Sequence, residues 1–362
     1  MIPIAKPLIG EEEKKAVIDV LNSGMLASGP KTQEFEKKFA EYVGTKYAIA
    51  TTSGTTALHL GLLALGVNPK DEVILPSFSF IATANVVLFC NAKPVFCDVD
   101  PKTFNIDPKK IEKLVTKKTK AIMPVHLYGQ AADMKPIMEI SEKHGLNIIG
   151  DACQAHGAVY NGKMVGSFGD LECFSFYPTK NMTTGEGGMV TTNNEELAEL
   201  MFSIRNHGRE KTKWGYEHER IGYNYRITDI GAAIGLEQLK KLPKNVAIRQ
   251  QNASYLNNHL KNVETPYVIA EAKHAYHQYT IKSKKRDELV QKLKKNEIGF
   301  GIYYPQPLHF YKHLKKYGHK DLKNSENLSK EVLSLPVHPA LSNQDLEKIV
   351  NVVNEVSQHP YK

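Results

Sequence analysis

Residues 47–75 read YAIATTSGTTALHLGLLALGVNPKDEVIL and contain the pattern that decides the fold. A short β-rich run, Tyr47–Ala50, is followed by a helical stretch, Thr55–Leu65, and then by a second β-rich run, Glu72–Leu75. Two short strands separated by one helix favour a parallel pair, because parallel strands need a long crossover connection. The stretch therefore predicts one unit of an α/β sheet with crossover helices.

The same alternation continues to about residue 240. Further strands are predicted at Pro94–Phe96, Ala121–Val125, Leu146–Ile149, Glu172–Phe176 and Gly188–Thr192. Helices are predicted at Glu11–Leu21, Thr32–Val43, Ile81–Cys90, Pro108–Leu114, Met134–His144 and Thr228–Leu239. The apolar residues of the first two helices recur at helical spacing, which places an amphipathic pair ahead of the sheet. This order predicts an α/β fold with a largely parallel sheet.

A second, smaller domain is predicted after Leu242-Pro243, where the sequence becomes lysine-rich. It would hold a helix to about Leu260, a strand at Ala275–Ile281, a helix near Asp287–Lys295 and a final helix from Asp345. A chain of 362 residues also exceeds the size at which single cores usually stop growing. We therefore expect a large domain over residues 1–240 and a small domain over residues 241–362.

The chain carries 47 Lys and Arg against 39 Asp and Glu, a formal net charge of +8. This excess comes from scattered pairs such as Lys117-Lys118 and Lys284-Lys285, not from one basic block interleaved with aromatic residues. Dispersed lysine is typical of a solvated surface, so no nucleic-acid partner is predicted.

The four cysteines, at positions 90, 97, 153 and 173, are too few and too irregularly spaced for a disulfide framework or a zinc site. The histidines show no metal-ligand spacing on one helix face, so no metal is predicted. No export signal and no apolar run of membrane-spanning length is present. We therefore expect a cytoplasmic protein without a membrane partner.

Three segments that follow predicted strands can carry chemistry. The turn at Ser53-Gly54-Thr55 offers hydroxyls and the free N–H groups of a helix N-terminus, which suit a phosphate. The same residues are also ordinary helix caps. Asp151 follows the apolar strand Leu146–Ile149, where ligands of open α/β sheets bind, although it could instead cap the next helix.

The third segment, FSFYPTKNMTTGEGGM at residues 174–189, places Lys180 among small residues and glycines between two strands. Lysine forms imines with aldehydes, and an acid paired with a pyridinium nitrogen is the companion requirement of pyridoxal phosphate chemistry. A phosphate turn, an acid and a lysine occur in this order along the chain. A surface lysine in a flexible loop is the alternative for Lys180 taken alone.

Five motifs in this chain resemble those of the DegT/StrS-type sugar aminotransferases, which are pyridoxal-phosphate enzymes of fold type I. They are SGTTALH at 53–59, PSFSFIATAN at 76–85, DACQAHG at 151–157, SFYPTKN at 175–181 and GYNYR at 222–226. The resemblance runs from about Ile2 to Leu239 and continues more loosely beyond. It implies a large domain with a mostly parallel mixed sheet and a smaller α+β C-terminal domain.

The resemblance also implies roles for individual residues around pyridoxal 5'-phosphate. Lys180 would bind the cofactor covalently, Asp151 would pair with the ring nitrogen, and Gln154 would lie near the phenolic oxygen. Phe80 would stack on the ring. Ser53, Gly54, Thr55 and Ser175 would hold the phosphate, with Asn224 of a neighbouring subunit. Without the resemblance, Phe80 would be interpreted as a core residue and Asn224 as a turn residue. His309 follows a segment similar to the family's substrate-side loop.

The activity implied is transfer of the amino group of L-glutamate to a nucleotide-linked 4-keto-6-deoxyhexose by a homodimer with active sites at the subunit interface. Some members of the family carry histidine in place of the lysine and catalyse dehydration, but Lys180 is present here. The stretch Thr183–Gly188 resembles members that aminate a 4-keto group, whereas Gln154 is common among 3-keto enzymes. Amination of a 3-keto sugar or a cyclitol, and a non-catalytic regulator that binds cofactor or sugar nucleotide, are the alternatives.

Overall fold

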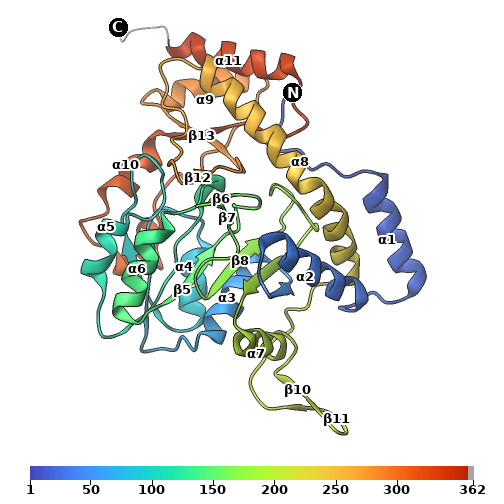
Figure 1. Ribbon diagram of the computed structural model, residues 1–362. Helices are drawn as coiled ribbons and strands as arrows, with labels where there is room; N and C mark the ends of the chain where they lie inside the picture. The colour runs from blue at the N-terminus through green and yellow to red at the C-terminus, as the bar shows by residue number, and fades with distance from the viewer. Residues whose placement is uncertain (358–362) are drawn as a thin grey trace.

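Seven strands form one sheet in the centre of the protein, in the order β1-β9-β8-β5-β4-β2-β3 (Figure 1). This computed structural model describes residues 1–357. Six strands run in one direction, and β9 runs antiparallel to its neighbours β1 and β8. The strands are β1 (Tyr47–Thr51), β2 (Glu72–Pro76), β3 (Lys93–Cys97), β4 (Thr119–Ile122), β5 (Asn147–Asp151), β8 (Leu171–Ser175) and β9 (Gly188–Thr192). The predicted α/β fold with a mostly parallel mixed sheet is confirmed.

Helices cover both faces of this sheet, because side chains alternate along each strand and both faces are apolar. Cys173 points into one core and its neighbour Phe174 into the other. One core includes α3 (Gly54–Ala64), α4 (Ala82–Phe89) and α7 (Glu195–Arg205). The other includes α2 (Pro30–Val43), α5 (Pro108–Ile111), α6 (Met134–His144) and the first half of α8 (Asp229–His259). The sheet is therefore buried on both faces, and its strand ends are the places left for a site.

The long helix α8 differs from the prediction of two helices separated at Leu242-Pro243. Pro243 lies inside one continuous helix, Asp229–His259. Proline removes one backbone hydrogen bond, which usually breaks or kinks a helix. Here α2 and α1 (Glu11–Ser23) pack along α8, and close to Pro243 the Glu13 carboxylate of α1 accepts hydrogen bonds from Gln238 Nε2 (2.7 Å) and Lys241 Nζ (2.7 Å). Tertiary contacts thus keep the helix continuous.

A separate apolar core lies beyond the middle of α8. It is built from the second half of α8 and from elements of the C-terminal part of the chain, and it also takes in Ile2. These elements are β13 (Tyr279–Lys282), α9 (Arg286–Lys295), β14 (Val332–Leu335) and α11 (Asn343–Ser357), and α10 (Lys323–Glu331) directly precedes β14. The division into domains 1–240 and 241–362 stays a proposal, and its boundary falls within α8.

Three further features were not predicted from the sequence. A small three-stranded sheet joins β6 (Val159–Tyr160), β7 (Lys163–Met164) and β12 (Ala272–Lys273). The hairpin β10 (Arg209–Thr212) and β11 (Gly215–His218) projects from the body of the molecule beyond α7 (Figure 1). The predicted strand Ala275–Ile281 begins only at Tyr279, because Tyr276 has a left-handed backbone conformation with φ +47° that no strand accommodates.

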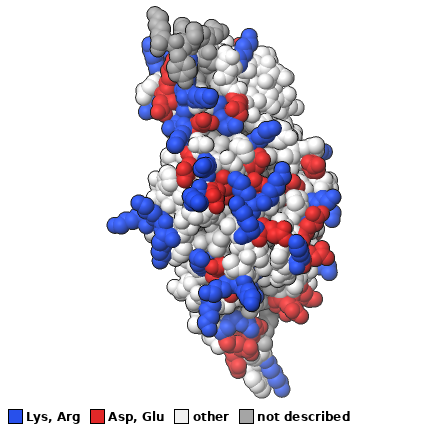
Figure 2. Space-filling model, turned by 90° about the vertical axis from the view of Figure 1, so that its left-hand side faces the viewer, with Lys and Arg blue, Asp and Glu red and all other residues white. Residues whose placement is uncertain are grey.

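Basic and acidic side chains mix over the surface. On the face drawn in Figure 2, Lys and Arg are spread over the whole height of the molecule with Asp and Glu among them. Surface ion pairs such as Lys38 with Glu41 and Lys143 with Glu112 are part of this mixture. Across residues 1–357, no helix combines the length and the apolar character that a bilayer crossing requires.

The buried His274 makes the stability of the fold depend on pH. Burial lowers the pKa of His274 to about 3, while an unfolded histidine titrates near 6.5. Below pH 6.5 the unfolded state therefore binds more protons, so the free energy of unfolding falls as the pH falls. We expect a loss of about 1 kcal/mol from this residue between pH 7.5 and pH 5.5. Urea denaturation at both pH values measures it.

The control variant is His274→Asn, whose side-chain oxygen can still accept the hydrogen bond that the Tyr276 N–H donates to Nδ1 (2.8 Å). This variant cannot titrate, so its stability should fall by about 1 kcal/mol less over the same pH interval. An identical pH dependence in both proteins would contradict the expected role of His274.

Candidate active site

A cavity of about 630 Å³ opens where β2, β5 and β8 end and α3 begins. Ligands of open α/β sheets bind at this carboxyl edge. Eight of the ten site residues predicted from the sequence line the cavity: Ser53, Gly54, Thr55, Phe80, Asp151, Gln154, Ser175 and Lys180. They come from four separate segments, which the sheet brings together at one edge.

The first turn of α3 forms one end of the cavity. The Ser53 side chain caps the helix by accepting a hydrogen bond from the Thr56 N–H (3.2 Å), as the alternative interpretation of this turn expected. The backbone N–H groups of Gly54 and Thr55 belong to the first turn, where the helix itself offers no acceptor. Because the helix dipole also favours negative charge here, this end suits a phosphate.

Gly54 allows this helix end to lie directly against β8 and the residues after β5. A Cβ atom at position 54 would lie 2.6 Å from Ser175 Cβ and 2.8 Å from Cys153 Sγ. Both neighbours belong to the cavity wall, so Gly54→Ala must displace α3 from it. We expect the substitution to lower the free energy of unfolding by about 1–3 kcal/mol.

The same displacement should weaken retention of pyridoxal phosphate by about 10-fold or more, since it moves the N–H groups of the phosphate end. Denaturation and equilibrium dialysis measure the two effects. Gly66→Ala is the matched control for glycine loss, because no atom lies within 4 Å of its Cβ position, although its φ of +69° adds backbone strain. Unchanged cofactor retention in Gly54→Ala would contradict the expectation.

Asp151 ends β5 with a buried carboxylate held from two sides. The Thr83 hydroxyl donates to Oδ2 (2.8 Å), and the Cys153 N–H donates to Oδ1 (3.2 Å). Thr83 is in turn within 2.9 Å of the Ser79 hydroxyl. Asp151 is 6% exposed, so these donors hold its carboxylate in a buried position.

Lys180 reaches the same cavity from the loop after β8. Its backbone N–H donates to the Tyr177 carbonyl (2.9 Å), which forms a turn and not a solvent-exposed helix. Burial lowers the pKa of the Lys180 ammonium, and the nearby Cys153 and Asp151 partly oppose this shift. A lysine with a lowered pKa presents more of its neutral, nucleophilic form at neutral pH. The surface-loop alternative for Lys180 does not describe this environment.

The side of the cavity beside Asp151 carries Gln154, Phe80 and Tyr304. The Gln154 Oε1 accepts from the Tyr128 N–H (2.9 Å), and its Nε2 donates to the Tyr304 hydroxyl (2.9 Å). Phe80 is 53% exposed and therefore is not a core residue; its ring centroid lies 6.1 Å from that of Tyr304. An accessible aromatic ring and a fixed amide flank the space beside Asp151.

Two of the predicted site residues do not line this cavity. Asn224 is exposed and lies in a segment that bridges to Asn206. His309 is 5% exposed; its Nδ1 lies 2.6 Å from the Ser77 hydroxyl and its Nε2 lies 3.3 Å from Glu326 Oε1. Both ring nitrogens of His309 thus have protein partners, because the segment Leu308–Phe310 folds back onto the end of β2.

Sequence reasoning missed several residues of the cavity wall. These are Tyr177, Thr179, Glu186, His277, Gln278, Tyr303 and Tyr304, together with Leu58, Ser79, Ala82 and Cys153. The C-terminal ones carried no local signal, since they lie about 100 residues beyond Lys180 in the sequence. The only available hint was that Tyr304 belongs to the proline-rich segment at 304–307.

The residues of the cavity fit pyridoxal phosphate by their chemistry. An open helix N-terminus suits its phosphate, an exposed aromatic ring suits its pyridine ring, and a buried carboxylate suits its protonated ring nitrogen. Lys180 is the amine that its aldehyde requires. The chemistry of these groups therefore favours this cofactor.

Comparison with known proteins agrees with this assignment. Residues 7–354 match the DegT/DnrJ/EryC1/StrS aminotransferase family. The chain is 41% identical over 368 residues to GDP-perosamine synthase of Caulobacter vibrioides, covering 98% of each chain. It is 40% identical over 337 residues to UDP-N-acetyl-3-dehydro-alpha-D-glucosamine 3-aminotransferase of Acidithiobacillus ferrooxidans, covering 92% of this chain and 90% of that one.

Among solved structures, the fold resembles that of DesV from S. venezuelae in complex with a ketimine intermediate. The TM-score is 0.93 at 35% identity, over 97% of this chain and 95% of that one. This chain and the solved neighbour therefore share one architecture over nearly their whole length.

Proposed function

Since this chain belongs to the DegT/DnrJ/EryC1/StrS aminotransferase family and is a pyridoxal-phosphate-dependent sugar aminotransferase, we propose that it aminates a nucleotide-linked 4-keto-6-deoxyhexose. The proposed amino donor is L-glutamate. The observation that carries the proposal is that Lys180 and the buried Asp151 line one cavity, which ends at the open first turn of α3.

Different residues of the cavity would bind different parts of the cofactor. Gly54 and Thr55 would donate their N–H groups to the cofactor phosphate, with the hydroxyls of Ser53 and Ser175 beside them. Phe80 would cover the ring and Asp151 would hold a proton on its nitrogen. When bound, the cofactor supplies an electron sink for the breaking C–H bond.

Lys180 would hold the cofactor between turnovers and would move a proton once a substrate amine has displaced it. Its lowered pKa suits this task, because a general base works best with a pKa near the operating pH. Gln154 keeps the wall fixed through Tyr304 and the Tyr128 N–H.

The proposal includes a homodimer in which Asn224 reaches the phosphate of the neighbouring subunit. The exposed position of Asn224 outside its own chain's cavity supports this arrangement. His309 is proposed only as a support of the substrate side, since its ring nitrogens face Ser77 and Glu326.

Amination of a 3-keto sugar is the second candidate, and a specific observation favours it. The Acidithiobacillus ferrooxidans relative is named as a 3-aminotransferase and is about as similar to this chain as the Caulobacter vibrioides relative. All residues discussed above would serve both reactions, so the product must distinguish them.

The test is a mass-spectrometric screen of GDP-, UDP- and dTDP-linked ketosugars with L-glutamate as donor, followed by NMR of the aminated product. We expect one 4-keto-6-deoxyhexose nucleotide to gain an amino group at carbon 4 while glutamate becomes 2-oxoglutarate. An amino group at carbon 3 would establish the second candidate. No aminated nucleotide sugar in any reaction would contradict both.

A further inference from the structure

His277 is a buried imidazole on the cavity wall that the mechanism above leaves without a task. It lines the cavity together with Lys180 and is only 6% exposed. Among the residues that the structure describes, its Nδ1 is enclosed and has no hydrogen-bond partner. Nε2 is not enclosed in this way, so we infer that the edge of the ring that carries Nε2 meets the cavity.

The enclosed Nδ1 indicates which nitrogen carries the proton. A buried N–H without an acceptor is rarer in proteins than an acceptor without a donor. The neutral ring is therefore best placed with its lone pair at Nδ1 and its proton at Nε2. In this tautomer His277 presents one hydrogen-bond donor to the cavity.

The backbone around His277 is held in a strained conformation. Tyr276 adopts φ +47°, which bulky residues rarely do. A Cβ at Gly129 would lie 2.8 Å from the His277 nitrogen, so the two backbones are in direct contact. The buried Arg249 donates to the Tyr276 carbonyl (3.0 Å). Strain that the surroundings maintain in this way is found preferentially at functional sites.

The same segment is tied to the loop that carries Lys180. Asn181, the next residue, donates from Nδ2 to the Ala275 carbonyl (3.0 Å) and the His156 carbonyl (3.2 Å). The Asn181 side-chain amide therefore links the backbone next to Lys180 to the backbone near His277. A group held in this way can position a substrate atom relative to Lys180.

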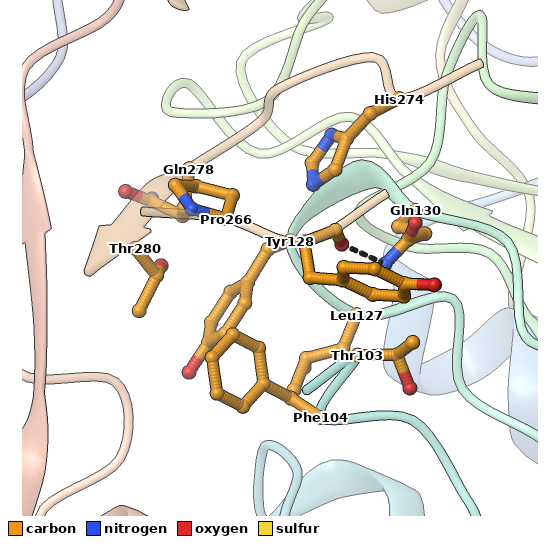
Figure 3. A pocket seen from close by; sticks show the side chains of 10 residues that line it. Thr103, Phe104, Leu127, Tyr128, Gln130, Pro266, His274, Gln278 and Thr280 are labelled. Atoms are coloured by element: carbon orange, nitrogen blue, oxygen red, sulfur yellow. Dashed lines mark hydrogen bonds between the residues drawn. The ribbon is translucent and has the colours of Figure 1, made fainter. Parts of the chain in front are cut away.

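Gln278 extends the polar wall next to His277. It lines the cavity and also the small neighbouring pocket of about 10 Å³, which is shown with Tyr128 and Thr280 in Figure 3. Its backbone N–H donates to the Tyr128 carbonyl (3.1 Å), which anchors the wall to the loop after β4. His277 and Gln278 therefore present neutral polar side chains on a wall that backbone hydrogen bonds hold in place.

We propose that His277 binds the ketosugar by donating a hydrogen bond from Nε2 to a hydroxyl or keto oxygen beside the reacting carbon. This inference rests on the proposed function and deepens it. It assigns a residue of the C-terminal part of the chain to recognition of the sugar ring.

A sugar oxygen suits His277 better than a carboxylate of glutamate. Burial and the cations of Lys180 and Arg249 hold the pKa of His277 well below its usual range, so the ring stays neutral. A neutral donor satisfies a hydroxyl, whereas a buried carboxylate needs a partner that stays charged. His277 should therefore act in the sugar half-reaction and not in the glutamate half-reaction.

The first measurement uses the cofactor-free protein and needs no turnover. Calorimetry gives the Kd of GDP-, UDP- and dTDP-linked hexoses and of the matching nucleoside diphosphates. For the sugar nucleotide that binds, His277→Leu should weaken binding by about 10-fold without changing the Kd of the nucleoside diphosphate. His277→Gln, whose amide can occupy the place of Nε2, should restore most of the affinity.

The second measurement follows the two half-reactions separately by absorbance in the loaded enzyme. His277→Leu should slow the ketosugar step by about 10-fold and leave the glutamate step within about 2-fold of the unmodified protein. His338→Gln is the matched control, because His338 is also buried with an unpartnered Nδ1 but lies outside the cavity. It should change neither half-reaction.

Three results for His277→Leu would overturn the role of His277. The rate of the glutamate step could fall as much as the rate of the ketosugar step, or the affinity for the nucleoside diphosphate could fall as much as the affinity for the sugar nucleotide. The variant could also behave like the unmodified protein. Urea denaturation of each variant separates these outcomes from a folding defect. If the unmodified protein accepts glutamate but binds and aminates no sugar nucleotide, the proposed function itself is wrong, and His277 has no sugar to bind.

Discussion

Lys180→Ala is expected to abolish transamination, with a fall in rate of about 10⁴-fold or more. The substitution removes both the amine that would hold the cofactor and the base that would move the proton, and no other described lysine lines the cavity. The absorbance band of covalently held cofactor, which borohydride reduces in the unmodified protein, should be missing. Steady-state kinetics and a spectrum before and after borohydride measure both effects.

The control for loss of a lysine is Lys163→Ala, an exposed residue of β7 outside the cavity. It should keep the band and the rate. Noncovalent cofactor should still bind to Lys180→Ala, since the helix end, Asp151 and Phe80 are unchanged. A variant that keeps both the band and more than about 1% of the rate would contradict the role of Lys180.

Asp151→Asn is expected to slow both half-reactions by about 10²–10³-fold while the cavity keeps its shape. The amide is close in size to the carboxylate and can still accept from the Thr83 hydroxyl, but it carries no charge to keep the ring nitrogen protonated. Retention of the cofactor should weaken as well. Single-turnover absorbance with glutamate and with the ketosugar measures the two steps.

Thr83→Val is a second variant that perturbs Asp151 less strongly. It removes the 2.8 Å hydrogen bond and keeps the negative charge of Asp151, so we expect a loss of about 3- to 10-fold in both steps. We specifically expect the rates of both half-reactions to fall far more in Asp151→Asn than in Thr83→Val. A glutamate step in Asp151→Asn at the unmodified rate would show that the charge is not needed.

The large sheet was predictable because its information is local. The strands of the large sheet are short apolar runs, and most of them alternate with helical stretches, so this alternation predicts the α/β class. Prediction failed where long-range contacts override local preference. Pro243 should interrupt a helix, yet packing by α1 and α2 holds α8 together through it.

The residues of the candidate site also fall into those that local sequence patterns predict and those that depend on long-range contacts. Ser53, Gly54, Asp151 and Lys180 lie at or just after the carboxyl ends of β1, β5 and β8, and these ends meet at one edge of the sheet because the three strands run in one direction. His277 and Tyr304 come from a part of the chain that local patterns describe only as a strand and a proline-rich loop. Their place on the wall depends on contacts made more than 100 residues away.

By itself, the sequence determined the fold class, the family and the order of phosphate turn, acid and lysine, because these are properties of short segments. Only the tertiary structure decided that His309 faces Ser77 and Glu326 and that His277 faces the cavity. The physical reason is that a side chain's surroundings are set by which distant segments pack against it. In this protein Gly129 and Asn181 contact the backbone beside His277, which lines the same cavity as Lys180.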